Sequence, residues 1–240
     1  MFEKTRDYPA AYIHDENDES LIRAIQWVLQ QAKSSGGTPL LYAPGTQNIN
    51  YREPISAFAK RYPVMTPRTR WGTDWPGGPV LAVWADDKML GEIGDNTRTT
   101  ALCAVLWGDR PLAWVAATGA VNLDPEAAGT TASLPPIDPL VRQGLMQLGH
   151  AVNHANALSG SMDRADAVSF FRLLVNNGLP VQPDALYAHA LADGWPERGA
   201  ARLREMATQV AKGGRPQGWN QQRWRPEVVD HWRRAAAAEE

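Results

Sequence analysis

Two short apolar runs in the first half of the chain constrain its fold more than any other feature. Residues 81–85 are followed directly by Asp86 and Asp87, and residues 101–107 are followed, after one glycine, by Asp109. Uninterrupted apolar runs of this length are typical of strands buried on both faces, as in a parallel sheet covered by helices. Ligands of such sheets usually bind just past the carboxyl ends of the strands. The two runs therefore point to one edge of the molecule as the place to look for a site.

Helical and strand patterns alternate around these runs. Apolar residues at a 3.6-residue period begin near Asp18 or Ser20 and predict a helix that ends at Gly36, and residues 38–42 predict a short strand. The alternation continues to residue 121. It predicts an α/β fold, namely a small, mainly parallel, three-layer unit of Rossmann-like type.

The strand signal disappears in the second half of the chain, where only helical patterns remain. Helices are predicted over 138–158, 163–177, 183–193 and 197–212. The expected organisation is an acidic extended segment over 1–17, an α/β domain over 18–122, a linker over 123–136, an all-helical domain over 137–212, and a basic tail rich in tryptophan and arginine over 213–240 that ends in a helix.

The bulk composition excludes several classes of protein. The 240 residues carry a net charge of −2, so the chain as a whole has no electrostatic preference for nucleic acid or an anionic surface. The single cysteine, Cys103, excludes an internal disulfide and a cysteine-based zinc site, and its place in an apolar run predicts an inert thiol. Neither a signal peptide nor an apolar stretch of membrane-spanning length is apparent, so we expect a cytoplasmic protein with no membrane partner.

The loop after the first predicted strand is a candidate ligand-binding loop. It contains Thr46, Gln47 and Asn48 behind a single glycine. A P-loop needs several glycines followed by Lys-Ser/Thr, and neither this motif nor G-x-G-x-x-G is present. The pattern therefore favours a plain turn over a nucleotide-binding loop, and it identifies no cofactor.

The acids that follow the two apolar runs are candidates for catalysis. Asp86, Asp87 and Asp109 can hold Mg²⁺ at the ends of buried strands, and Arg110 can clamp a phosphate with two hydrogen bonds. An apolar strand followed by Asp-Asp resembles a Walker B strand in a general way. This suggests a Mg²⁺-dependent nucleotide or phosphoester hydrolase with its site at the carboxyl ends of the strands. A helix-capping or solvated role for the acids is favoured, however, so no metal is predicted.

Two histidines, His150 and His154, have the i,i+4 spacing of zinc ligands on a helix. The apolar stripe of the same predicted helix places both on the opposite, solvent face. We therefore expect two exposed histidines rather than a zinc site.

The basic C-terminal third carries the pattern that favours nucleic acid. Residues 186–206 loosely resemble a helix-turn-helix with its turn at 193–194, although an ordinary antiparallel pair of helices is favoured. Arginine supplies phosphate contacts, and tryptophan supplies a stacking face for bases. The predicted nucleic-acid-binding residues are Arg198, Arg202, Arg204, Arg215, Trp219, Arg223, Trp224 and Arg225.

These patterns lead to one function hypothesis and two alternatives. The hypothesis is a cytosolic binding or regulatory protein that engages DNA or RNA through its helical half, with the α/β half as a scaffold or small-ligand sensor. The first alternative is the Mg²⁺-dependent hydrolase. The second is an adaptor that binds another protein and catalyses nothing. The sequence leaves open whether the chain is an enzyme.

Overall fold

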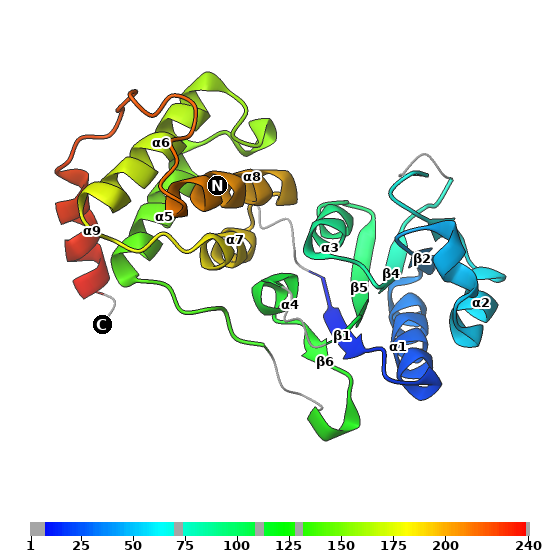
Figure 1. Ribbon diagram of the computed structural model, residues 1–240. Helices are drawn as coiled ribbons and strands as arrows, with labels where there is room; N and C mark the ends of the chain where they lie inside the picture. Colours follow the sequence, from blue (N-terminus) through cyan, green and yellow to red (C-terminus); the bar gives the residue numbers. More distant parts are fainter. Residues whose placement is uncertain (1–7, 70–73, 109–112, 128–131, 239–240) are drawn as a thin grey trace. The chain divides into compact units, whose positions relative to one another are not determined.

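The chain divides into two compact units, Met1–Ser133 and Leu134–Glu240. The computed structural model describes residues 8–69, 74–108, 113–127 and 132–238 (Figure 1). The first unit is α/β and the second is helical, as the sequence predicts. The division falls within the predicted linker.

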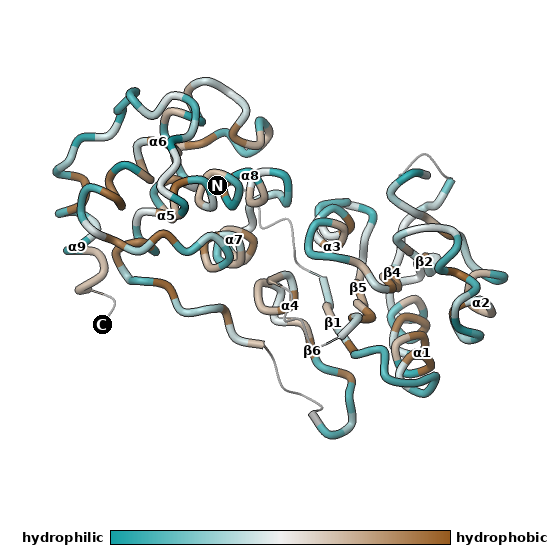
Figure 2. Tube along the Cα trace, viewed as in Figure 1, coloured by the Kyte–Doolittle hydropathy of each residue, from teal (hydrophilic) through white to brown (hydrophobic). Residues whose placement is uncertain are grey.

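The first unit is built on a sheet in which all described strand pairings are parallel. The spatial order is β3-β2-β4-β5-β1-β6. The two apolar runs form β4 and β5, the central pair of the sheet, and Figure 2 shows apolar residues along both. The strands are β1 (Ala10–His14), β2 (Leu40–Tyr42), β3 (Val64–Met65), β4 (Gly78–Val83), β5 (Thr99–Leu106) and β6 (Val121–Asn122).

Strand β1 corrects the expectation that residues 1–17 form an extended segment outside the α/β domain. It lies inside the sheet, paired with β5 on one side and β6 on the other. Ala11 and Ile13 are fully buried against one layer of helices, and Ala10 packs against the other. Its five residues include two alanines and a histidine, and acids flank it, so the sequence shows no long run of large apolar residues there. The burial comes from the pairing on both sides.

Helices cover both faces of this sheet, which confirms the three-layer architecture. Side chains alternate along each strand, so Leu81 of β4 belongs with Leu21 to the buried cluster on one face, while Ala82 belongs with Trp114 to the cluster on the other. The first face is covered by α1 (Asp18–Ser35) and α2 (Glu53–Ala59), and the second by α3 (Asp87–Gly94) and α4 (Ala113–Thr118) (Figure 1).

The connections create two topological switch points at the carboxyl edge of the sheet. Helices α1 and α2 follow β1 and β2 on one face, whereas α3 and α4 follow β4 and β5 on the other. The neighbours β2 and β4, and likewise β5 and β1, therefore send the chain to opposite faces. In parallel sheets such switch points are where ligands bind.

Within its described residues, the second unit is built from five longer helices. Helices α7 and α8 form a hairpin, and α5 packs against both α6 and α9. Gly194 takes a positive φ of 84° in the α7–α8 turn, a conformation that suits glycine. The helices are α5 (Pro139–Ala151), α6 (Ser161–Asn176), α7 (Pro183–Ala192), α8 (Glu197–Ala211) and α9 (Val228–Ala237). Within the described ranges, no helix has both the length and the apolarity needed to cross a membrane.

The predicted helix over 138–158 is too long. Helix α5 ends at Ala151 because Val152 is extended, and Asn153 then caps a short 3-10 helix, His154–Asn156. His150 and His154 therefore do not share a helix. His150 is exposed as expected, but His154 is half-buried, with Nε2 2.9 Å from the Gly149 carbonyl oxygen and its ring edge-on to Trp195.

The buried position of Cys103 in β5 gives a first prediction. Burial raises the pKa of its thiol well above the ordinary value, so the reactive thiolate is suppressed in the native protein. We expect Cys103 to react with a disulfide reagent such as DTNB far more slowly in the native protein than after unfolding in guanidinium chloride. Equal rates in the two states, followed by absorbance, would contradict the burial of β5.

Candidate functional site

The predicted ligand loop lies at the carboxyl edge of the sheet. Thr46, Gln47 and Asn48 begin a 3-10 helix, Thr46–Asn50, which three residues separate from the end of β2. The side chain of Gln47 folds over Gly45, where an added Cβ would lie 2.6 Å from the amide. Thr46 and Gln47 are exposed and Asn48 is half-buried. The loop therefore reaches the edge where a ligand would bind, but it forms a turn rather than a phosphate cradle.

The two candidate catalytic acids after β4 form local structural bonds. Asp86 caps α3, because its Oδ1 accepts a hydrogen bond of 2.7 Å from the Met89 N–H. Asp87 Oδ1 accepts a hydrogen bond of 2.9 Å from the backbone N–H of Trp114 and so ties α3 to α4. The favoured capping role is confirmed for Asp86. The other two candidates, Asp109 and Arg110, lie outside the described residues.

A metal centre has no support in the described part of the chain. Within it, no three His, Cys, Asp or Glu side chains gather closely enough to hold an ion.

Two of the predicted nucleic-acid-binding residues anchor the tail to α6. The Arg223 Nη1 donates to Asp166 Oδ2 at 2.8 Å, and the Trp224 Nε1 donates to Asp166 Oδ1 at 2.9 Å. Burial raises the pKa of the Asp166 carboxyl, while the bond from Trp224 and the charge of Arg223 act in the opposite direction. The ring of Trp224 also lies 6.2 Å from that of Trp232. These two side chains therefore hold the second unit together.

Two further arginines of the predicted interface are engaged on the hairpin. Arg202 pairs with Glu205 at 2.9 Å. Arg204 pairs with Asp184 and lies over the ring of Tyr187, with its Cζ 5.2 Å from the centroid.

The remaining predicted residues differ in exposure and in place along the chain. Arg198, Arg215 and Arg225 are exposed, with no acidic partner among the described residues, and Trp219 is half-buried. Arg198 and Arg215 flank opposite ends of the 15-residue α8, which places them roughly 20 Å apart along the helix axis. Nucleic-acid binding by the helical half stays a prediction.

Three aromatic side chains meet at the carboxyl edge of the sheet, and we call them the edge aromatic cluster: Tyr51, Trp84 and Trp107. The ring centroids are 5.8 Å apart for Tyr51 and Trp84, 6.1 Å for Tyr51 and Trp107, and 6.3 Å for the two tryptophans. Tyr51 is 63% exposed and Trp107 is 65% exposed, whereas Trp84 is half-buried beneath them. The cluster therefore presents large aromatic faces to solvent on a fixed base.

Trp84 adopts a strained backbone conformation at the end of β4. Its φ is +52°, in the left-handed region, which for a bulky residue costs on the order of 1–3 kcal/mol. Its backbone N–H donates to the Val105 carbonyl oxygen at 2.8 Å, and its indole Nε1 donates to Asp15 Oδ2 at 2.9 Å. The surrounding bonds thus hold this indole where an unconstrained chain would not.

An ion-pair network with one buried carboxylate fixes the loop that carries Tyr51. Arg52, the next residue, pairs through Nη1 with Asp15 Oδ1 at 3.0 Å and through Nη2 with Asp18 Oδ1 at 2.6 Å. The hydrogen bond that Arg52 donates to Asp18, with the charges of both acids, raises the pKa of the Arg52 guanidinium. The side chain of Asp15 is only 5% exposed. Asp15 therefore holds Trp84 with one oxygen and the Tyr51 loop with the other.

Trp107 is positioned by the same segment after β1. The Nδ1 of His14 lies 3.1 Å from the carbonyl oxygen of Gly108, and the Asp15 N–H donates to the Leu106 carbonyl oxygen at 2.9 Å. These bonds tie both chain neighbours of Trp107 to β1. All three cluster residues thus depend on His14 and Asp15.

This cluster was not predicted from the sequence. In the sequence, Trp84 and Trp107 belong to the two apolar runs, and Tyr51 was assigned no role. The available signal was that a tryptophan stands last, or next to last, in each run before polar residues begin. With β4 ending at Val83 and β5 at Leu106, each indole follows directly after the last residue of its strand.

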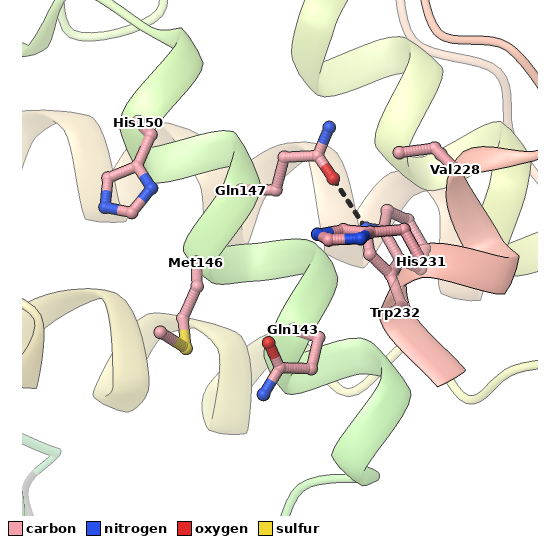
Figure 3. Close-up of a pocket in the computed structure, with 7 residues that line it drawn as sticks. All are labelled: Gln143, Met146, Gln147, His150, Val228, His231 and Trp232. Carbon is pink, nitrogen blue, oxygen red and sulfur yellow. Dashed lines mark hydrogen bonds between the residues drawn. The ribbon is translucent and has the colours of Figure 1, made fainter. Parts of the chain in front are cut away.

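The second unit contains a smaller candidate site, a pocket of about 300 Å³ between α5 and α9 (Figure 3). Across it, the Trp232 Nε1 donates to Gln147 Oε1 at 2.7 Å. The lining includes no carboxylate, thiol or hydroxyl group, and its ionisable side chains are the imidazoles of His150 and His231. The lining residues are Gln143, Met146, Gln147, His150, Val228, His231 and Trp232.

The contacts of Trp224 predict that it is structural. We expect Trp224→Ala to lower the free energy of unfolding of the second unit by about 3 kcal/mol, because it removes ring packing and a bond to buried Asp166. The matched control, Trp219→Ala in the same tail, should cost less than about 1 kcal/mol. Urea unfolding of the full chain, followed by circular dichroism, measures both. Equal small losses would contradict the anchoring role of Trp224.

Comparison with known families finds a match in the second unit. Residues 137–233 match a family model described as a domain of unknown function, DUF1889. Comparisons with curated proteins and with solved structures give no match. The matched segment begins just before α5 and ends within α9, so it contains the α5–α9 pocket, while the edge aromatic cluster lies outside it.

Proposed function

We propose that this chain is a ligand-binding protein whose α/β unit takes up a small molecule at the carboxyl edge of its sheet. The observation that carries the proposal is the edge aromatic cluster, where Tyr51 and Trp107 are each more than 60% exposed. Exposed rings of this size are unfavourable in water unless a partner covers them. Their position beside the switch points of a parallel sheet is where a ligand is expected.

The proposed ligand has an apolar group that packs on the faces of these rings. Covering about 100 Å² of aromatic surface contributes roughly 2.5 kcal/mol, or about 70-fold in affinity. The rings are already held in place by His14, Asp15 and Arg52. Little side-chain entropy is therefore lost on binding, which favours a useful affinity from a small contact area.

The edge contacts favour binding over phosphoester hydrolysis. Asp86 caps a helix and Asp87 accepts from a backbone N–H. Arg52, the cation nearest the cluster along the chain, is engaged by two carboxylates. A small-ligand sensor agrees better with these contacts than a Mg²⁺-dependent hydrolase does.

Caffeine, a flat and uncharged probe, tests the proposed site. We expect it to shift the indole Nε1–H resonances of Trp84 and Trp107 in a ¹⁵N-labelled NMR titration and to leave that of buried Trp114 unmoved. Trp107→Ala removes one exposed face and should weaken probe binding roughly 10-fold. Trp219→Ala in the helical unit is the control and should leave binding unchanged.

Because Trp107 is exposed, Trp107→Ala should leave the fold intact, as circular dichroism can verify. Shifts confined to the helical unit, or undiminished binding by Trp107→Ala, would contradict the proposal.

A further inference from the structure

We infer that the ligand of the edge aromatic cluster is a small organic cation, in which a positive charge sits on an apolar carbon frame as in a quaternary ammonium group. This inference rests on the proposed function and names the chemical class of its ligand. It follows from the charges that surround the cluster.

The carboxyl edge of the sheet is strongly acidic. All strands are parallel, so the segments that follow them share one edge. Within the described parts of these segments, the basic residues are Arg52, Arg68 and Lys88. The acidic residues there are Asp15, Glu16, Asp18, Glu19, Glu53, Asp86, Asp87, Asp124 and Glu126.

Contacts within this edge leave the excess negative charge largely uncompensated. Arg52 is shared between Asp15 and Asp18, so the group of three keeps one net negative charge. Glu16, Glu19 and Glu53 are exposed and form no ion pair within the described ranges. The first turns of α1, α2 and α3 offset part of this charge through their helix dipoles. The remaining field attracts cations and repels phosphates and carboxylates.

The aromatic faces also favour a cation over a neutral or negatively charged ligand. The face of an indole or phenol ring is the negative pole of its quadrupole, so it attracts a cation with a carbon surface. Because the three centroids lie about 6 Å apart, the rings touch one another and leave no space between them. The cation therefore packs on the outward faces of Tyr51 and Trp107. There, both the apolar contact and the charge of the cation contribute to its affinity. A neutral ligand gains only the apolar contact, and an anion is repelled.

Three probes of nearly identical shape separate charge from apolar contact: choline, 3,3-dimethylbutan-1-ol and 3,3-dimethylbutanoate. At low salt, we expect choline to bind roughly 2- to 5-fold more tightly than the neutral alcohol, and the carboxylate to bind most weakly. The preference for choline should fall as salt rises. The shifts of the Trp84 and Trp107 indole resonances measure all three affinities.

The double variant Glu16→Gln with Glu19→Gln tests the origin of the preference. It removes two exposed charges, so it should reduce the ratio of choline to alcohol affinity while leaving alcohol binding unchanged. Glu227→Gln, an exposed acid of the second unit, is the matched control and should leave the ratio as it was.

The outcomes distinguish this inference from the proposed function. Equal binding of choline and the neutral alcohol, or tighter binding of the carboxylate, would overturn the cationic ligand while the aromatic site stands. If neither caffeine nor any of the three probes shifts the two indoles, both the inference and the proposed function are wrong.

Discussion

The carboxylate of Asp15 is buried just past the end of β1, where one oxygen accepts from the indole of Trp84 and the other pairs with Arg52. Burying a carboxylate is costly unless it is paired and hydrogen-bonded, and here both oxygens have partners. Through these two bonds a single side chain fixes the strained residue after β4 and the loop after β2. The neighbouring His14 approaches the segment after β5. The geometry of the carboxyl edge therefore depends on two residues at the end of one short strand.

The architecture of the first unit could be predicted because burial on both faces leaves a direct mark on composition. The central strands β4 and β5 must be apolar at nearly every position, and they are. Strand β1 left a weaker mark, because it is short, two of its five residues are alanines and acids flank it. Its place in the sheet follows from pairing with β5 and β6, which are distant in the chain.

The position of the candidate site at the carboxyl edge of the sheet could be predicted from the sequence, but the residues that form it could not. Parallel strands put the loop at Thr46–Asn48 and the segments after β4 and β5 on one edge, as expected. The sequence does not tell a core tryptophan from one that stands just past the end of a strand, since one residue of register separates them. The same difficulty applies to the tail, where Arg223 and Trp224 meet an acid of α6 more than fifty residues earlier. Arg223 and Trp224 are residue types suited to nucleic-acid binding, but here they attach the tail to α6.

Tryptophan therefore has two different roles in this chain. Trp224 and Trp232 of the second unit pack against other rings and donate hydrogen bonds to Asp166 and Gln147, whereas Trp107 of the first unit is held rigidly and left exposed. The edge aromatic cluster, a rigid and exposed aromatic surface in an acidic setting, is the feature on which the proposed function depends. A crystal structure of the full chain grown with choline tests it most directly. We expect ligand density against the outward faces of Tyr51 and Trp107. Density only in the pocket between α5 and α9 would contradict the proposed site at the edge aromatic cluster.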